Sequence, residues 1–252
     1  MNRRRRLDAE LVRRGLSSSR TQAAEAVDLR RVLVNGAVAE KVSRQVDPAD
    51  AIVIAGDPPR FVSRGGEKLD AALVAFGVDV AGRRVLDAGA STGGFTDCVL
   101  QRGAAEVVAA DVGHGQLHPR IRNDARVAVL ERYNVRDLQP ADIGGVVDIV
   151  VADLSFISLR RVLAALLRAC APAAPLVLLV KPQFEAGRQE VSRGKGVVTD
   201  PAIHARVRGE IEADLIEHGC AVLGWIDSPL TGADGNREFL VHATSPGQVS
   251  LP

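Results

Sequence analysis

The sequence predicts an α/β fold in which a doubly wound, Rossmann-like sheet of seven strands follows a small N-terminal α+β domain. From about residue 80 onward, short apolar runs alternate with helical stretches, and the runs are continuous, which is typical of strands covered on both faces. Asp57-Pro58-Pro59-Arg60 interrupts this pattern, because consecutive prolines deny the chain helix and sheet hydrogen bonds. We therefore expect one domain over residues 1–57, a linker over 58–62 and a second domain over 63–252.

The N-terminal domain is expected to contain two short helices and a small sheet. Apolar residues within 7–16 recur at helical spacing, and Gly15 is a suitable stop for that helix. The serines at 17–19 can cap a second helix over Ala23 to Val27. Residues 32–34 and 51–54 are strand candidates, and Asn35-Gly36 predicts a turn.

The second domain is expected to alternate strands with helices. Its apolar runs are short, rich in valine and too brief for helices. We expect strands at residues 85–86, 107–110, 127–130, 147–152, 176–180, 222–226 and 238–242, and helices that begin near Gly93, Ile157 and Ala202.

Charge is distributed unevenly along the 252 residues. The net charge is only +1, but residues 1–44 carry 11 Lys and Arg against 5 Asp and Glu, whereas the remainder carries 21 against 26. A basic block of this kind is either a solvated face or a surface for a polyanion. Both interpretations stay open at this point.

Several classes of protein are disfavoured. No window approaches about 18 uninterrupted apolar residues, so we expect no membrane span. Acidic residues soon follow the basic start, which argues against an export signal and favours a cytoplasmic protein. Cys98, Cys170 and Cys220 lie far apart in apolar context, which indicates buried thiols. His114 and His118 lie among glycines, and we expect no metal site.

A glycine-rich turn follows the strand at Val85-Leu86 and opens a helix. Its spacing differs from the dinucleotide pattern, and Asp87 would repel a pyrophosphate while suiting a cationic amino-acid group. Asp111 ends the next strand, where a carboxylate can accept both hydroxyls of a ribose. Asn134, after the third strand, is a candidate for a polar contact with adenine. These features describe a nucleoside joined to an amino acid, as in S-adenosylmethionine, although a glycine-rich turn alone can be a tight connection.

Two further charged residues follow strands of the predicted sheet. Asp153 ends the fourth strand and Lys181 ends the fifth. A lysine that follows five apolar residues is costly to bury unless it reaches solvent or has a task. Lys68 and Glu238, considered alone, look like surface charges.

Long motifs carry a family resemblance over almost the whole chain. Residues 63–69, 86–95, 111–117, 152–159 and 181–185 resemble the haemolysin-A-type (TlyA) ribosomal RNA methyltransferases. Residues 63–252 are similar to FtsJ-like ribose methyltransferases, and residues 6–36 resemble the RNA-binding domain named after ribosomal protein S-four. The resemblance implies 2′-O-methylation of ribosomal RNA, with cytidine as the nucleotide and S-adenosylmethionine as the cofactor.

The resemblance also implies a site. A tetrad of Lys68, Asp153, Lys181 and Glu238 is implied, in which Lys181 is our candidate base because a neutral lysine can accept the proton of a ribose hydroxyl. We expect cofactor contacts from Asp87, Gly89, Ser91, Gly93, Gly94, Phe95, Asp111, Asn134 and Asp153. We expect RNA phosphate contacts from Arg4, Arg6, Arg20 and Arg31.

Three alternative functions fit the sequence less well. Asp153-Leu154-Ser155-Phe156 loosely resembles the loop of base amino-group methyltransferases but lacks its prolines, and a base-flipping site would favour more than 3% aromatic residues. A membrane-active haemolysin would need an amphipathic basic helix. An RNA-binding module with an inactive enzyme domain conflicts with an intact tetrad. Longer relatives continue into a basic C-terminal helix, so modification of one or both ribosomal subunits stays open.

Overall fold

The computed structural model describes residues 4–17, 19–28, 30–56, 59–232 and 234–247. The chain divides into two compact units, residues 1–63 (unit 1) and 64–252 (unit 2). The predicted boundary at residues 57 and 58 lies outside the described residues, so the linker over 58–62 stays a prediction.

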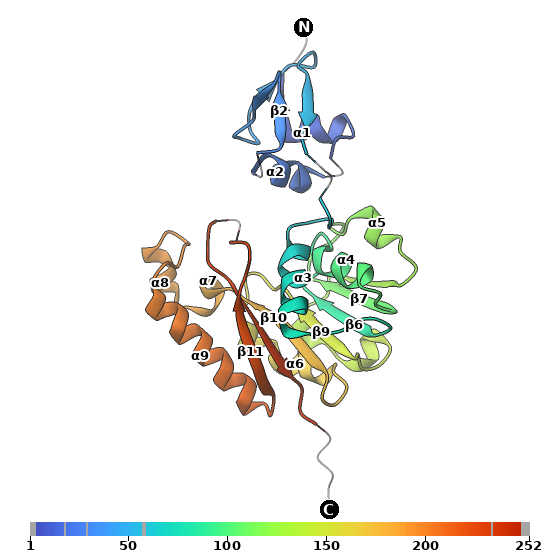
Figure 1. Cartoon of the computed structure of the whole chain (residues 1–252), viewed down its shortest axis with the longest axis vertical. Helices are drawn as coiled ribbons and strands as arrows, with labels where there is room; N and C mark the ends of the chain where they lie inside the picture. The colour runs from blue at the N-terminus through green and yellow to red at the C-terminus, as the bar shows by residue number, and fades with distance from the viewer. Residues whose placement is uncertain (1–3, 18, 29, 57–58, 233, 248–252) are drawn as a thin grey trace, which may run out of the picture. The chain divides into compact units, whose positions relative to one another are not determined.

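Unit 1 contains the two helices and the small sheet that the sequence predicts. Strand β2 pairs antiparallel with both β3 and β5, and apolar side chains from the helices and this sheet share one core. Helix α1 ends before Gly15, whose φ of +70° suits a glycine. The elements are β1 (Arg5–Arg6), α1 (Leu7–Arg13), α2 (Arg20–Asp28), β2 (Val32–Val34), β3 (Ala37–Val38), β4 (Gln45–Val46) and β5 (Ile52–Ile54) (Figure 1).

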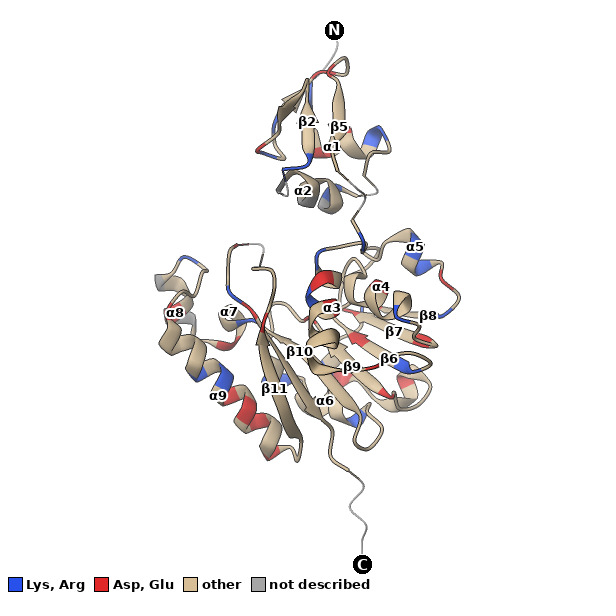
Figure 2. Cartoon of the chain, in the orientation of Figure 1, with Lys and Arg blue, Asp and Glu red and all other residues tan. Residues whose placement is uncertain are grey.

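The ribbon of β1 and β4 in unit 1 is not predicted by the sequence. The two strands are antiparallel, with Arg6 opposite Gln45, and the backbone N–H of Leu7 donates to the Arg44 carbonyl at 2.8 Å. Because three of its four residues are polar, no apolar alternation marks it. The Lys and Arg residues of unit 1 are spread over several elements, among them this ribbon and the two helices (Figure 2).

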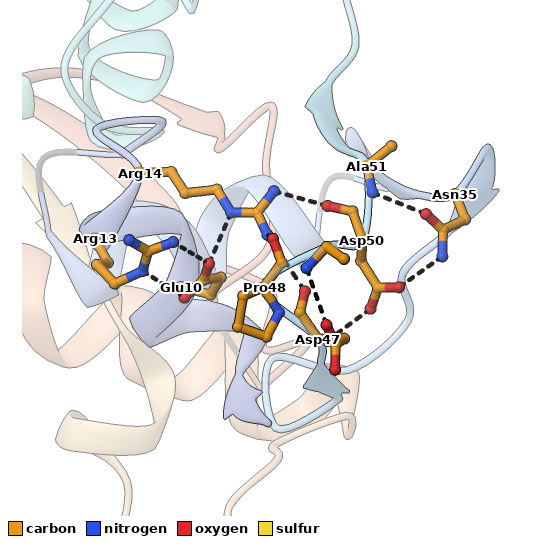
Figure 3. A network of polar contacts seen from close by, with 9 residues as sticks. Glu10, Arg13, Arg14, Asn35, Asp47, Pro48, Asp50 and Ala51 are labelled. Carbon is orange, nitrogen blue, oxygen red and sulfur yellow. Dashed lines mark hydrogen bonds and ion pairs between the residues drawn. The ribbon is translucent and has the colours of Figure 1, made fainter. Parts of the chain in front are cut away.

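A buried carboxylate, Glu10, ties α1 to the turn before β5. Arg13 and Arg14 both donate to it, at 2.6 and 2.8 Å. Arg14 also donates to backbone carbonyls within residues 47–50, and Asn35 bonds to the side chain of Asp50 in the same network (Figure 3). A charge this deeply buried needs such partners. The network therefore fixes α1 on the sheet of unit 1.

Unit 2 is built on a seven-stranded sheet with the order β11-β12-β10-β9-β6-β7-β8. All neighbours pair in parallel except β12, which is antiparallel to β10 and β11. After β6 the chain adds β7 and β8 on one side of it and then β9 on the other side. A topological switch point therefore lies beside β6. The strands are β6 (Arg84–Ala88), β7 (Glu106–Asp111), β8 (Val127–Glu131), β9 (Ile149–Ala152), β10 (Pro175–Val180), β11 (Ala221–Asp227) and β12 (Phe239–Thr244).

Helices cover both faces of this sheet (Figure 1). Leu86 and Ala88 pack in one core cluster with Leu166 of α6, whereas the intervening Asp87 bonds to Thr96 of α4. Successive strand residues thus point to opposite faces. The helices are α3 (Gly65–Phe76), α4 (Gly94–Gln101), α5 (Pro119–Arg122), α6 (Leu163–Arg168), α7 (Pro182–Glu185), α8 (Arg188–Arg193) and α9 (Pro201–Glu217), with short 3₁₀ turns η1 (Val135–Asp137), η2 (Pro140–Ile143) and η3 (Leu159–Arg161).

The predicted strands all form, and the predicted helices near Gly93 and Ala202 are α4 and α9. The helix expected near Ile157 begins differently: the chain first makes η3, and α6 starts only at Leu163. Glu185 explains this start, because it accepts hydrogen bonds from the Ser158 hydroxyl at 2.5 Å and the Leu159 N–H at 2.7 Å. Helix α3 is an addition that the sequence did not predict.

The structure bears on the predictions about cysteines, membrane spans and metal sites. The cysteines are free and buried, as predicted, and burial raises the pKa of the Cys170 thiol to about 12. Within the described ranges, no helix combines the length and apolar character that crossing a bilayer requires. In the same ranges, no three His, Cys, Asp or Glu side chains gather as a metal site would need.

Candidate active site

A cavity of about 580 Å³ opens at the carboxyl ends of β6, β7 and β9. Ligands bind at this edge in open α/β sheets, next to the switch point. The described residues that line it include five of the predicted cofactor residues. The lining residues are Gly89, Ser91, Asp111, Val112, Gly113, Gln116, Asn134, Val135, Arg136, Asp153, Leu154, Ser155, Phe156, Ile157 and Arg161.

The turn after β6 brings two backbones unusually close. Gly89 has a φ of +88°, and a Cβ at this position would lie 2.5 Å from the carbonyl oxygen of Asp153. Its N–H donates to the Ala110 carbonyl at 2.8 Å. Only glycine meets both conditions without displacing β9. The glycine predicted from sequence is therefore required by the closeness of the strand ends.

Asp111 is held with its carboxylate at the cavity wall. The N–H of Ser91 donates to one carboxylate oxygen at 2.8 Å, and the N–H of Gly113 donates to the other at 2.6 Å. Each oxygen keeps acceptor capacity, because a carboxylate oxygen can accept more than one hydrogen bond. This geometry suits a pair of neighbouring hydroxyls.

Four predicted cofactor residues do not line the cavity in the described structure. Gly93, with a φ of +95°, and Gly94 form the start of α4, and Phe95 packs in the interior. Asp87 is fully buried: the Thr96 hydroxyl donates to one of its oxygens at 2.6 Å, and the other oxygen has no hydrogen-bond partner among the described residues. Burial raises the pKa of Asp87 to about 7. Direct cofactor contact by these residues stays a prediction.

Asn134 lines the cavity where the sequence analysis expected it. Its side-chain oxygen accepts a hydrogen bond from the Arg136 N–H at 3.1 Å and thereby caps η1. The amide NH₂ of Asn134 is the group that can still serve a ligand.

Lys181 lies at the end of β10, and its ammonium forms an ion pair with one residue of the cavity wall and a hydrogen bond with another. Its Nζ is 2.5 Å from Asp153 Oδ1 and donates to Ser155 Oγ at 2.9 Å. The side chain is almost completely buried, so these contacts replace solvation. A lysine held in this way can accept a proton when neutral or stabilise an oxyanion when charged.

Lys68 and Glu238, which the sequence presents as surface charges, form a buried ion pair at 2.5 Å. Lys68 lies on α3, and Glu238 immediately precedes β12. Because Val180 pairs with Phe239 across the antiparallel strands, Glu238 and Lys181 occupy neighbouring positions at the same end of β10 and β12. The fold thus brings the four predicted tetrad residues to one edge as two ion pairs.

Ser155 and Glu185 were missed by the sequence analysis. Ser155 bonds to Lys181, and Glu185 binds the loop after Asp153 through Ser158 and Leu159. Burial raises the pKa of the Glu185 carboxyl. The available signal was their place in the motifs at residues 152–159 and 181–185, directly after β9 and β10.

The four arginines predicted to bind RNA lie in unit 1, in different settings. Arg4 is exposed. Arg6 and Arg20 form ion pairs with Asp8, at 3.0 and 2.8 Å. Arg31 donates to the carbonyl of Ala55 at 3.0 Å. Contact with RNA stays a prediction for all four.

Comparison with known proteins identifies the family. Residues 61–245 match the FtsJ-like methyltransferase model, and residues 5–52 match the S4 domain. The chain is 53% identical over 242 residues to the 16S/23S rRNA (cytidine-2′-O)-methyltransferase TlyA of Mycobacterium tuberculosis, covering 96% of this chain and 90% of that protein. This chain belongs to the TlyA family of FtsJ-like methyltransferases.

Another relative and a solved structure are also similar to this TlyA-family chain. The 23S rRNA (cytidine-2′-O)-methyltransferase TlyA of Campylobacter jejuni is 28% identical over 253 residues, covering 92% of this chain and 96% of that protein. A solved structure from Streptococcus thermophilus, named as a hemolysin, has a TM-score of 0.78 and 38% identity, covering 99% of this chain and 92% of that one. Residues of both the S4 domain and the methyltransferase domain of this chain are covered by these matches.

Proposed function

We propose that this protein transfers a methyl group from S-adenosylmethionine to the ribose 2′-hydroxyl of a cytidine in ribosomal RNA. The observation that carries the proposal is the contact of Lys181 with Asp153 and Ser155, two residues that line the cavity. The class of reaction follows from the family, and the nucleotide and the RNA follow from the names of its relatives.

The cavity fits the proposed cofactor. Asp111 offers both carboxylate oxygens to ribose hydroxyls, and Asn134 offers an amide to the base. Gly89 lets the turn after β6 lie against the Asp153 backbone at the cavity wall, and Asp153 adds negative charge suited to a cationic group. When bound there, S-adenosylmethionine supplies an electrophilic methyl group on a sulfonium.

Lys181 is the proposed base for the attacking hydroxyl. A 2′-hydroxyl is a weak nucleophile, so its proton must leave as the bond to carbon forms. Asp153 and Ser155 fix the position of Nζ, and the serine hydroxyl can bond to either protonation state of the lysine, since it both donates and accepts. Their part in the reaction is to orient Lys181 toward the hydroxyl.

The Lys68–Glu238 pair borders the same reaction centre. Its two charges are mutually compensated and buried, so removal of either partner leaves an uncompensated charge beside Lys181. We assign Lys68 and Glu238 to the binding and orientation of the target ribose.

RNA recognition is assigned to both units. Unit 1 supplies Arg4, Arg6, Arg20 and Arg31 for phosphates. In unit 2, Phe156 beside the cavity is 92% exposed with a φ of +64°, and its ring lies 5.2 Å from that of Phe184. An exposed ring of this kind offers a stacking face to a base. Ribosomal RNA as substrate would place the reaction in the cytoplasm.

A direct assay tests the proposed function. Purified protein is incubated with S-adenosylmethionine and isolated large or small ribosomal subunits that lack the modification, and ribose methyl groups are mapped by mass spectrometry. We expect a 2′-O-methylcytidine in the large-subunit RNA, and the small subunit decides whether one or both are substrates. A methyl group on a base nitrogen, or none on either subunit, would contradict the proposal.

A further inference from the structure

Asp8, at the start of α1, is a buried carboxylate that contacts two arginines. Asp8 is only 4% exposed. Arg6 donates to it through Nε at 3.2 Å and Nη2 at 3.0 Å, and Arg20 donates through Nη2 at 2.8 Å and Nε at 3.3 Å. The N–H of Ala9 donates to the same carboxylate at 2.8 Å. Asp8 thus joins two arginines that lie far apart in sequence.

Both guanidinium groups keep donors that Asp8 does not use. Each binds Asp8 through its Nε and Nη2 edge, and a planar guanidinium carries further N–H groups on the edge formed by both Nη atoms. The side chains of Arg6 and Arg20 remain 46% and 60% exposed. Among the described residues, Asp8 is the only carboxylate that either arginine contacts. The remaining edges match the paired oxygens of a phosphodiester.

We propose that Asp8 is a positioning residue of the RNA-binding surface, which holds Arg6 and Arg20 as a preformed clamp for an RNA phosphate. The proposal rests on the proposed function, since it assumes that unit 1 binds ribosomal RNA. It goes beyond that function by assigning an acidic residue a favourable part in binding a polyanion.

Glu10, the second buried acid on the same helix, uses its two arginines differently. Arg14 is only 20% exposed and also donates to backbone carbonyls within residues 47–50, whereas Arg13 is 48% exposed. Glu10 therefore leaves one of its arginines open to solvent and uses the other to fix the fold of unit 1, whereas Asp8 leaves both of its arginines open.

Preorganisation and simple electrostatics make opposite predictions for loss of the Asp8 charge. Replacing Asp8 with asparagine makes unit 1 more positive, and long-range attraction alone would tighten binding to RNA. However, free arginines must lose rotamer entropy when they bind, and a clamp that is already ordered avoids that cost. The direction of the change in affinity therefore distinguishes the two effects.

The test uses the full chain and transcribed 23S ribosomal RNA as the probe. Asp8→Asn should raise the dissociation constant about threefold to tenfold, the scale of lost ordering of two long side chains, with an unchanged dependence on salt. Glu40→Gln is the matched control, because it removes the same charge from an exposed pair with Arg30. It should leave affinity unchanged or slightly tighter. Tighter binding by Asp8→Asn would overturn the proposal.

A double-mutant cycle separates positioning from folding. In the Arg6→Ala/Arg20→Ala background, Asp8→Asn should no longer weaken RNA binding, because no clamp is left to order. An equal loss in both backgrounds would mean that Asp8 only supports the fold, and the proposal would be wrong. If Arg6→Ala/Arg20→Ala itself leaves the affinity for RNA unchanged, these arginines do not bind RNA and the proposal of a clamp is wrong. Methylation of the RNA in the same samples then tests the proposed activity independently.

Discussion

Lys181 shows how a single residue can be recognised from sequence when its environment is local. It follows five buried residues of β10, and the position alone indicates that its ammonium must be compensated. Asp153 was recognised for the same reason, at the end of β9. Their contact follows from two parallel strands ending at the same edge.

Replacing Lys181 tests whether it acts as a base. Lys181→Ala should abolish methyl transfer while leaving cofactor and RNA affinity nearly intact, because the lost interaction belongs to the transition state. Lys181→Arg should fail as well, since arginine keeps the charge but cannot give up its proton. The measurement is single-turnover methylation with saturating cofactor across pH.

Two results would change the role assigned to Lys181. Near-normal rates in Lys181→Arg would leave oxyanion stabilisation as the better account. Loss of cofactor affinity in Lys181→Ala would instead assign the lysine to ground-state binding.

Asp87 makes a prediction about stability and pH. Burial raises its pKa from 3.8 to about 7, so the folded chain holds a proton that the unfolded chain releases. The stability that this group contributes is therefore complete below pH 3.8 and is lost as pH rises toward 7. Asp87→Asn should remove that loss, because a neutral amide can still accept from Thr96.

Thermal unfolding between pH 5 and 8 measures the effect of Asp87→Asn. The variant should gain stability relative to the wild type as pH rises. Asp124→Asn is the control, because Arg126 lowers the pKa of Asp124 to about 2, outside this window. Parallel pH profiles for the wild type and Asp87→Asn would show that Asp87 is ionised throughout.

At the scale of elements, the sequence predicts the strands that apolar runs mark, and it misses the features that depend on contacts with other segments. The seven strands carry continuous apolar runs, and all were predicted. The β1–β4 ribbon is short and polar, so it has no clear period. Helix α3 begins with two glycines and two charged residues, and the helical spacing of Leu69, Ala72, Leu73 and Phe76 that follows was overlooked. The Lys68–Glu238 pair depends on α3 and on the antiparallel register of β12, which explains why each residue looked like a surface charge alone.

The turn between β6 and α4 makes a second structural prediction. In Gly89→Ala, a Cβ would lie 2.5 Å from the Asp153 carbonyl oxygen, in addition to the strain of a φ of +88°. We expect loss of cofactor binding by calorimetry, with a fall in stability larger than the strain alone produces.

Gly115→Ala is the matched control for the turn. Gly115 has a φ of +69°, and nothing lies within 4 Å of the added Cβ, so this variant carries strain without a clash. Equal effects of the two substitutions would mean that the contact with β9 is not what requires glycine at position 89.

At the scale of the whole molecule, charge and chemistry are divided between the units. All of the cavity and tetrad residues lie in unit 2, whereas the basic excess of residues 1–44 lies in unit 1. This division was visible in the sequence because proline interrupts the pattern of both domains.

A fragment of residues 61–252 tests the division. It should bind S-adenosylmethionine as the full chain does, because Gly89, Asp111 and Asp153 are all present. It should bind ribosomal RNA more weakly and with a shallower dependence on salt, since the arginines of unit 1 are missing. Calorimetry and RNA titrations at several salt concentrations are the measurements. A folded fragment that no longer binds the cofactor would contradict the assignment.

The last strand in chain order does not lie at the edge of the sheet. β12 is inserted between β10 and β11, and the residue before it pairs with Lys68 near the start of unit 2. During translation, the cavity residues at 89–161 therefore leave the ribosome well before the tetrad is complete. A product truncated before residue 238 therefore has every residue that lines the cavity but lacks Glu238, the partner of Lys68, and all of β12.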